Sequence, residues 1–202
     1  MERNEGDWFE RIYEQAESAG SRVPWDRGAP HRHLVDWVQR EHIDGVGKRA
    51  VVIGCGLGDD AEFVASRGFE TVGFDIARSA IRMAQRRFRD SGVTYAVANL
   101  FALPAGWSQS FDLVVENQTA QALPGEIRRG AVATIASLVA PGGLLLFLAN
   151  RAVPGQPVVG PPYSLARSEL DQVQDAGLAP VSIESLSSNG QPRWRAVYRR
   201  PA

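Results

Sequence analysis

The feature that most constrains the fold is the alternation of short β-rich runs with amphipathic helical windows along this 202-residue chain. The pattern predicts a helix that begins near residue 60, a second helix over 79–88, and strands at 50–53, 71–75, 93–98, 111–116 and 143–149. Strands separated by helical crossovers are typical of a parallel sheet. We therefore expect an α/β protein.

The C-terminal end breaks this alternation. The runs APVSIESL (179–186) and RWRAVYRR (193–200) flank SSNGQP, a turn-rich connection that is too short for a crossover helix. These two segments should pair antiparallel and bring the predicted total to seven strands. The proline-rich segment VPGQPVVGPP (153–162) is interpreted as an active-site loop.

Composition and charge narrow the function classes. A chain of this length with 44% hydrophobic and 22% charged residues predicts one globular domain over 1–202. The formal net charge of -1 offers no footprint for nucleic acid, and the basic cluster Arg86, Arg87 and Arg89 is interpreted as a solvated helix face. The N-terminus lacks an apolar signal core, and the apolar run 143–149 is too short to span a bilayer. We expect a soluble, cytoplasmic protein without nucleic-acid or membrane partners.

The stretch GCGLGDD (54–60) follows the first predicted strand and opens a helix. Gly54 and Gly56 lack Cβ atoms, so the backbone there can approach a ligand, although a tight turn without a ligand is the alternative for such a loop alone. Asp59 is predicted to cap the helix, with Glu62 completing a capping box. Cys55, the only cysteine, is interpreted as a packing residue rather than as a nucleophile.

Asp75 ends the second predicted strand, and its position indicates the kind of ligand. A carboxylate at such a strand terminus can accept hydrogen bonds from both hydroxyls of a ribose. The loop departs from the dinucleotide fingerprint because its third glycine comes early, and Asp59 and Asp60 place negative charge where a pyrophosphate would bind. S-adenosylmethionine fits better, since its ribose carries no phosphate and its sulfonium bears an amino-acid tail.

Four segments, in chain order, resemble the thiopurine methyltransferase superfamily and, within it, the small thiol and halide methyltransferases. They are VPWDRGAPHRHLVDWV, VVIGCGLGDDAEFVASRGFETVGFDIARSAI, FDLVVENQTAQALPGEIRRG and GPPYSLARSEL. The resemblance implies a class I S-adenosylmethionine-dependent methyltransferase that releases S-adenosylhomocysteine. It also implies a Rossmann-like, seven-stranded, mostly parallel sheet of order 3-2-1-4-5-7-6, with helices on both faces. The single domain would comprise an N-terminal helical lid and entry segment (1–47), a cofactor-binding core (48–150), and an acceptor loop with the C-terminal strands (151–202).

The resemblance further implies the residues that hold the cofactor. Trp25 would lie over the methionine moiety, Asp75 would hold the ribose, and Glu116 would end the fourth strand beside the transferable methyl. Asn99 stands where the family usually has an aspartate near the adenine amino group, so its amide oxygen would make that contact. The full set of cofactor-binding residues is Trp8, Trp25, Gly54, Cys55, Gly56, Asp75, Ile76, Asn99, Leu100 and Glu116.

The aromatic residues in this set have a second interpretation. Trp8 belongs to an aromatic helix face with Phe9 and Tyr13, which could pack on the core or cover the cofactor cleft, and the resemblance favours the cleft for Trp8. The ring face of Trp25 can stabilise a sulfonium, with simple packing as the alternative.

Two pairs of polar residues carry weaker signals for ligand binding. The spacing of His31 and His33 suits a metal poorly, so we predict surface histidines and no metal. Tyr163 and Ser164 could contact the acceptor, although Ser164 could instead cap the helix that follows.

The predicted reaction is methyl transfer from S-adenosylmethionine to a small-molecule acceptor, which the resemblance suggests is a thiol. A thiol is partly ionised near neutrality and needs no dedicated base, so no catalytic residue is assigned and Glu116 is expected to serve cofactor binding. The alternatives are methylation of oxygen or nitrogen on a small metabolite, and a non-enzymatic module that only binds the nucleoside. The sequence does not predict the acceptor's identity or the oligomeric state.

Overall fold

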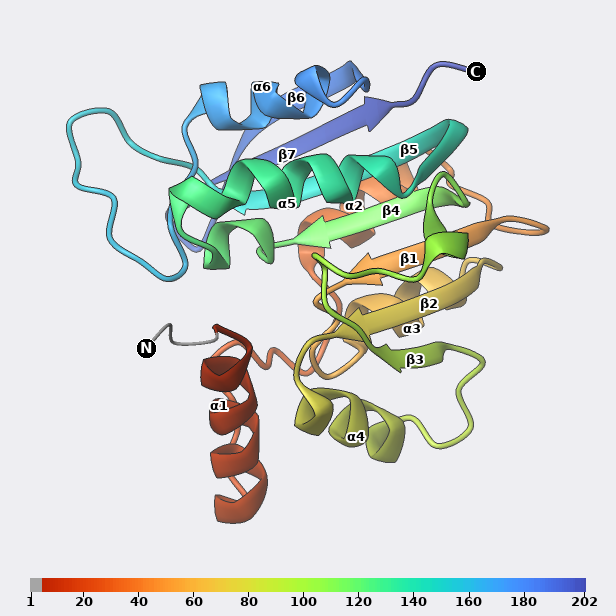
Figure 1. Ribbon diagram of the computed structural model, residues 1–202, viewed down its shortest axis with the longest axis vertical. Helices are drawn as coiled ribbons and strands as arrows, with labels where there is room; N and C mark the ends of the chain where they lie inside the picture. The colour runs from red at the N-terminus through yellow and green to blue at the C-terminus, as the bar shows by residue number, and fades with distance from the viewer. Residues whose placement is uncertain (1–4) are drawn as a thin grey trace. The chain divides into compact units, whose positions relative to one another are not determined.

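The computed structural model describes residues 5–202, and the strands within that range form one seven-stranded sheet (Figure 1). The strands are β1 (Arg49–Ile53), β2 (Glu70–Asp75), β3 (Thr94–Val97), β4 (Phe111–Asn117), β5 (Val139–Asn150), β6 (Ala179–Ser188) and β7 (Gln191–Arg199). Their order is β3-β2-β1-β4-β5-β7-β6, which confirms the predicted Rossmann-like topology. The chain forms two compact units, an N-terminal unit that ends at Ala102 and a C-terminal unit that begins at Leu103. The interpretation of the chain as a single domain stays a prediction.

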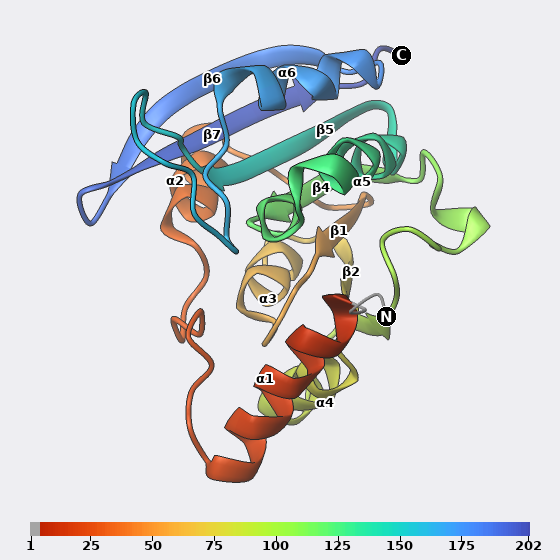
Figure 2. The same cartoon turned by 60° about the vertical axis from the view of Figure 1, so that its left-hand side comes forward.

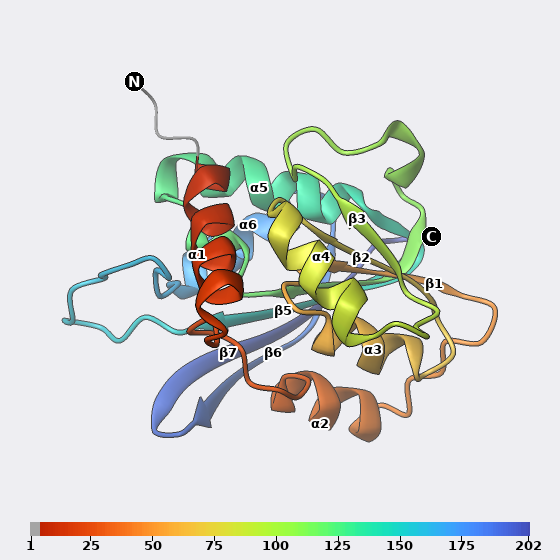
Figure 3. The same ribbon diagram turned by 90° about the horizontal axis from the view of Figure 1, so that it is seen from below.

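The N-terminal unit contains three parallel strands joined by helices. β1 pairs with β2 and β2 pairs with β3, through the crossover helices α3 (Asp59–Ala65) and α4 (Arg78–Arg87) (Figure 3). The run 50–53 in β1 is fully buried, as expected for a parallel strand covered on both faces. In α4, the predicted apolar stripe is confirmed at Ala80, Ile81 and Ala84, and the helix ends at Arg87 with Phe88 as its C-cap.

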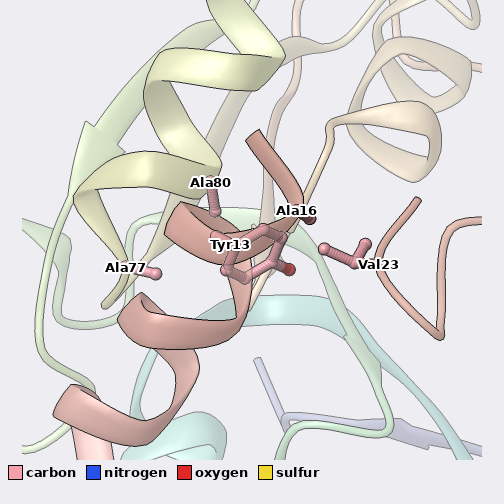
Figure 4. Packing of buried hydrophobic residues seen from close by; sticks show 5 residues of the cluster. All are labelled: Tyr13, Ala16, Val23, Ala77 and Ala80. Atoms are coloured by element: carbon pink, nitrogen blue, oxygen red, sulfur yellow. The ribbon is translucent and has the colours of Figure 1, made fainter. Parts of the chain in front are cut away.

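The predicted N-terminal helix is present as α1 (Glu5–Ala19), and it packs along α4 (Figure 2). Tyr13 and Ala16 of α1 meet Ala77 and Ala80 at the start of α4, together with Val23 (Figure 4). These side chains form a small apolar cluster within the N-terminal unit. The cluster explains why a helix with a mostly polar sequence is ordered, because burial of its apolar stripe supplies the stability that short helices lack alone.

Ion pairs reinforce the contact between α1 and α4. The Glu17 carboxylate of α1 forms ion pairs with Arg82 and Arg86 of α4. Arg87 of α4 forms an ion pair with Asp59 of α3 at 3.0 Å. Arg86 and Arg87 are exposed, as predicted for a solvated helix face, and acidic residues of α1 and α3 pair with them there.

The histidine prediction is also wrong. His31 and His33 are each only 4% exposed, at the start of α2 (Arg32–Arg40). His31 is the N-cap residue, and its Nδ1 accepts a hydrogen bond from the backbone N–H of His33. A histidine nitrogen thus caps the helix N-terminus, a role that an aspartate or serine oxygen usually has.

The C-terminal unit mixes parallel and antiparallel pairing. β4 and β5 are parallel and joined by α5 (Gly125–Ser137), which packs against α6 (Arg167–Asp175). β7 pairs antiparallel with both β5 and β6, which confirms the predicted hairpin. Its turn contains Asn189 and Gly190, both at positive φ, as two-residue hairpin turns require. Short 3-10 turns lie at Ala105–Trp107 and Ala120–Ala122.

Two boundaries in this unit differ from the prediction. β5 begins at Val139 rather than at residue 143, because Val139 already pairs with Phe111 before a register shift. A Cβ on Gly143 would lie 2.9 Å from the Ala140 carbonyl oxygen, so only glycine fits at that shift. Ser164 does not cap α6, whose N-cap is Ala166; the Glu169 carboxylate accepts the Ala166 N–H at 2.8 Å.

The segment 153–162 is a long loop between β5 and α6, drawn in cyan in Figure 1. No helix within residues 5–202 is long and apolar enough to cross a membrane.

Candidate functional site

The loop between β1 and α3 depends on glycine for two reasons. Gly54, Gly56 and Gly58 have φ values of 56°, 53° and 94°, which L side chains rarely adopt. A Cβ on Gly58 would lie 2.3 Å from the Tyr95 hydroxyl, and one on Gly56 would lie 3.0 Å from the Tyr13 hydroxyl. Two of the three glycines therefore make room for the protein's own tyrosines, a role that the sequence did not reveal.

The predicted capping box at the start of α3 is wrong. The N-cap is Gly58, which has no side chain to cap with and whose carbonyl accepts the Glu62 N–H at 2.9 Å. Glu62 instead accepts a hydrogen bond from the Tyr95 hydroxyl at 2.7 Å. Asp59 is the first residue of the helix, where its negative charge interacts favourably with the positive end of the helix dipole.

The two aspartates of this loop hold neighbouring elements together. Asp60 accepts the backbone N–H of His31 at 2.6 Å and so fixes the segment that leads into α2. Asp59 pairs with Arg87 of α4, as described above. Both carboxylates thus act within the protein, which weakens the prediction that they repel a phosphate ligand.

Asp75 lies at the end of β2, directly beside the glycine loop. Its Oδ2 accepts the Gly56 N–H at 3.0 Å, and its Oδ1 accepts the Ala77 N–H at 2.9 Å. The side chain is buried, and this desolvation raises the pKa of the carboxyl to about 6 despite the backbone donors. Each oxygen has a second lone pair, so the carboxylate can still accept hydrogen bonds from a ligand.

Aromatic side chains from α1 and the following segment form a cluster beside this loop. Trp25 lies 5.6 Å from Tyr13, 6.0 Å from Phe9 and 6.3 Å from Trp8, measured between ring centroids. The Trp25 indole N–H donates to the Tyr13 hydroxyl at 2.7 Å. Leu57 of the glycine loop packs on the same apolar cluster as Trp25. These contacts hold α1 and the segment that contains Trp25 against the loop between β1 and α3.

The structure separates the two predicted tryptophans by exposure. Trp8 is 40% exposed, whereas Trp25 is partly buried and held by Tyr13. Tyr13 is 2% exposed, and burial raises the pKa of its phenol, with the negative charge of Asp75 adding to the effect. The sequence indicates Tyr13 only as part of an aromatic face, through its spacing of four from Phe9.

The remaining predicted residues of this unit have mixed environments. Cys55 is buried, and this burial raises the pKa of its thiol, which favours the packing interpretation over the nucleophile. Ile76 is 38% exposed and Leu100 is buried. Asn99 is exposed, and its Oδ1 accepts the Phe101 N–H at 2.9 Å. One lone pair of this oxygen, which is predicted to contact the adenine, is therefore already used.

Glu116 lies near the end of β4 in the C-terminal unit and is fully buried. Its Oε1 accepts the Ala120 N–H at 2.7 Å, whereas its Oε2 has no hydrogen-bond partner among the described residues. Burial raises the pKa of this carboxyl to about 8. Near neutral pH the group therefore carries a proton and can donate a hydrogen bond.

No cluster of three or more histidine, cysteine, aspartate or glutamate side chains arranged for a metal occurs in the part of the chain that the structure describes. The prediction that the protein binds no metal stays a prediction.

Comparison with known proteins identifies the family. The methyltransferase domain family matches residues 50–143. A ubiquinone biosynthesis O-methyltransferase from Burkholderia pseudomallei (strain K96243) is 33% identical over 190 residues, which cover 81% of this chain and 81% of that protein. The chain belongs to the class I S-adenosylmethionine-dependent methyltransferases. Its cofactor is S-adenosylmethionine, its coproduct is S-adenosylhomocysteine, and its acceptor is a small molecule.

Other relatives of this methyltransferase differ in the acceptor that their names describe. A 2-heptyl-1-hydroxyquinolin-4(1H)-one methyltransferase from Mycobacteroides abscessus is 27% identical over 178 residues, covering 86% of this chain and 77% of that protein. A probable thiol methyltransferase 2 from Arabidopsis thaliana is 28% identical over 192 residues, covering 92% of this chain and 77% of that protein.

Solved structures confirm the fold. The N-methyltransferase NodS from Bradyrhizobium japonicum, in complex with S-adenosylhomocysteine, matches with a TM-score of 0.75 and 21% identity, covering 99% of this chain and 100% of that chain. A structure described as "Conversion of a Disulfide Bond into a Thioacetal Group during Echinomycin Biosynthesis" matches with a TM-score of 0.77 and 24% identity, covering 97% of this chain and 93% of that chain.

Proposed function

We propose that this methyltransferase transfers the methyl group to the sulfur of a small thiol. The observation that carries the proposal is the state of its two buried strand-end carboxyls. Both oxygens of Asp75 accept backbone N–H groups, and Glu116 is protonated near neutral pH. In this proposal the ribose takes the remaining lone pairs of Asp75 and Glu116 holds a proton, so neither group acts as the base and the acceptor supplies its own ionised nucleophile.

A thiol meets this requirement. Alkyl thiols have a pKa of about 8.5, so a few per cent is thiolate near neutrality, and thiolates are strong nucleophiles. The leaving group is already activated as a sulfonium, and the protein mainly has to align the two reactants and exclude water. The likeness to the probable thiol methyltransferase 2, which spans 92% of this chain, agrees with this acceptor class.

The proposal includes the cofactor-binding residues expected from the sequence. The ionised form of Asp75 would accept the ribose hydroxyls through the lone pairs that the backbone leaves open. Trp25, fixed by Tyr13, would present its ring to the sulfonium. The exposed Trp8 would cover the same ligand, which gives α1 its predicted lid role.

Methylation of an oxygen is the second candidate function. The relative that is 33% identical is an O-methyltransferase, which favours this alternative. Without a free base, such an acceptor would need an acidic hydroxyl that ionises near neutrality. Family membership argues against the third interpretation, a module that binds the nucleoside without catalysis.

A panel of acceptors with labelled S-adenosylmethionine tests the proposal. We expect turnover of alkyl thiols and thiophenols, with a pH inflection that follows the pKa of each thiol across a substituted series. An enzymic base would instead give one inflection for all acceptors. Methylated phenols or amines, with no product from any thiol, would show that the thiol assignment is wrong.

A further inference from the structure

A small basic pocket lies at the C-terminal end of β5. Its volume is about 130 Å³, and its walls come from the end of β5, the loop that follows it, and the start of β7. Arg151 and Arg193 both line it, and none of the described residues that line it is acidic. Gln156, Gln191 and Ser164 add neutral hydrogen-bond donors. Two cations and several donors around one small space suit an anion.

Arg151 is held firmly in this wall. Its backbone N–H donates to the Pro192 carbonyl at 3.0 Å, and its guanidinium carbon lies 5.7 Å from the centroid of the Trp194 ring. The Trp194 indole N–H donates in turn to the Leu165 carbonyl at 2.8 Å, which fixes the ring. Arginine stacked on an aromatic face keeps the edge of its guanidinium available for a planar anion.

One donor of Arg151 has no acceptor among the described residues: its Nε is buried and makes no hydrogen bond. A buried donor of this kind is unfavourable unless a ligand satisfies it. Arg195, on the neighbouring part of β7, is different, because the Glu184 carboxylate accepts from its Nε at 2.8 Å. The sheet provides a carboxylate for Arg195, whereas the pocket beside Arg151 provides none.

The pocket adjoins the end of β4, where Glu116 lies. Asn150, another lining residue, accepts a hydrogen bond from the Gln118 side chain at 3.2 Å, and Gln118 directly follows β4. β4 and β5 are parallel, so their C-terminal ends meet at one edge of the C-terminal unit. In α/β proteins this edge is where ligands bind.

We propose that this pocket binds a planar anionic group, a carboxylate, on the methyl acceptor. This inference rests on the proposed methylation of a small acceptor. The volume limits the bound part to one small charged group, because whole ligands usually occupy pockets of about 300 Å³ or more. The acceptor class is therefore a small nucleophile, preferably a thiol, that carries a second, negatively charged group.

Binding is tested without turnover, on the full chain saturated with S-adenosylhomocysteine. The probes are benzoate, its neutral analogue benzamide, and inorganic phosphate, and the readout is the NMR signal of the Arg151 Nε–H. We expect benzoate to shift this signal saturably, with at least about tenfold weaker effects from benzamide, as for loss of a charge-assisted hydrogen bond. Equal shifts by benzoate and benzamide would overturn the proposal. Tighter binding of phosphate than of benzoate would assign the pocket to a free anion and overturn its link to the acceptor.

A kinetic test compares 3-mercaptobenzoate with 3-mercaptobenzamide, which offer the same nucleophile. The wild type should prefer the carboxylate by about tenfold in kcat/KM, and Arg151→Gln should abolish that preference through KM. Arg129→Gln, on the exposed side of α5, is the matched control and should keep the preference. A preference that persists in Arg151→Gln would refute the assignment. If neither thiol is methylated while benzoate still binds through Arg151, the thiol proposal fails and the anion pocket stands.

Discussion

The protonation of Asp75 should control both stability and cofactor affinity. Burial raises the pKa of this carboxyl from 3.8 to about 6. That difference corresponds to about 3 kcal/mol. The folded protein favours the protonated form, so this stabilisation is fully present below pH 3.8 and is lost as the pH rises through about 6. Without a ligand, this group alone should lower the free energy of unfolding by about 3 kcal/mol over that range.

Cofactor binding should oppose this effect. Ribose hydroxyls that donate to Asp75 favour the ionised carboxylate and lower its pKa. If the bound pKa returns to its ordinary value, affinity for S-adenosylhomocysteine should fall by about 60-fold between neutral pH and about pH 4. Binding near pH 5 should also release a proton from the protein.

Isothermal titration calorimetry from about pH 4.5 to 7.5, in buffers of different ionisation enthalpy, measures both the affinity and the proton release. In Asp75→Asn both should become nearly independent of pH, because the amide does not titrate. The exposed Asp90, after α4, provides the matched control, and Asp90→Asn should behave as the wild type. A wild-type affinity that does not change with pH, or the same pH dependence in Asp75→Asn, would refute the ribose role.

Three further predictions follow from individual contacts. Gly58→Ala should destabilise the protein by at least about 1–2 kcal/mol in urea unfolding, because its φ is 94° and Tyr95 fills the space for a Cβ; Gly106→Ala, which meets no atom within 4 Å, should be mild by comparison. Glu10→Gln should weaken the anchoring of α1, because the Glu10 carboxylate accepts hydrogen bonds from the backbone N–H and the hydroxyl of Ser79 in α4. Hydrogen exchange in α1 should accelerate, and unchanged protection would contradict this role. The raised pKa of Glu116 predicts that the wild type loses stability as the pH rises from 4.5 through about 8. Glu116→Gln should remove this loss, and a pH profile of thermal unfolding that is the same in both proteins would contradict the buried acid.

The sheet could be predicted because its signals are local. Each buried parallel strand is a short apolar run, and the connection lengths alone distinguish crossover helices from the final hairpin. The starts of elements were less predictable, because contacts between distant segments decide them. Asp59 pairs with Arg87, and Glu62 accepts a hydrogen bond from the Tyr95 hydroxyl, so neither carboxylate caps α3 as its spacing suggested.

The candidate site was predictable to a similar degree. Asp75 follows from its distance to the glycine loop, and the structure places it in contact with Gly56. The roles of Tyr13 and Glu10 come from α1, which lies far away in sequence and carries no motif. Arg151 and Arg193 are brought together only by the pairing of β5 with β7, which sets Asn150 opposite Arg193. Such juxtapositions depend on the register of the sheet.

The two strand-end carboxyls show how much local structure adds to one sequence signal. Asp75 and Glu116 both end a buried strand, and burial is the main cause of the raised pKa in each. Backbone N–H groups of Gly56, Ile76 and Ala77 lower the pKa of Asp75 toward its ordinary value, so it stays near 6. Glu116 has fewer such donors, keeps one oxygen without a partner among the described residues, and reaches about 8. At neutral pH, Asp75 is therefore an anion that can only accept hydrogen bonds, as a ribose requires, whereas Glu116 holds a proton that it can donate.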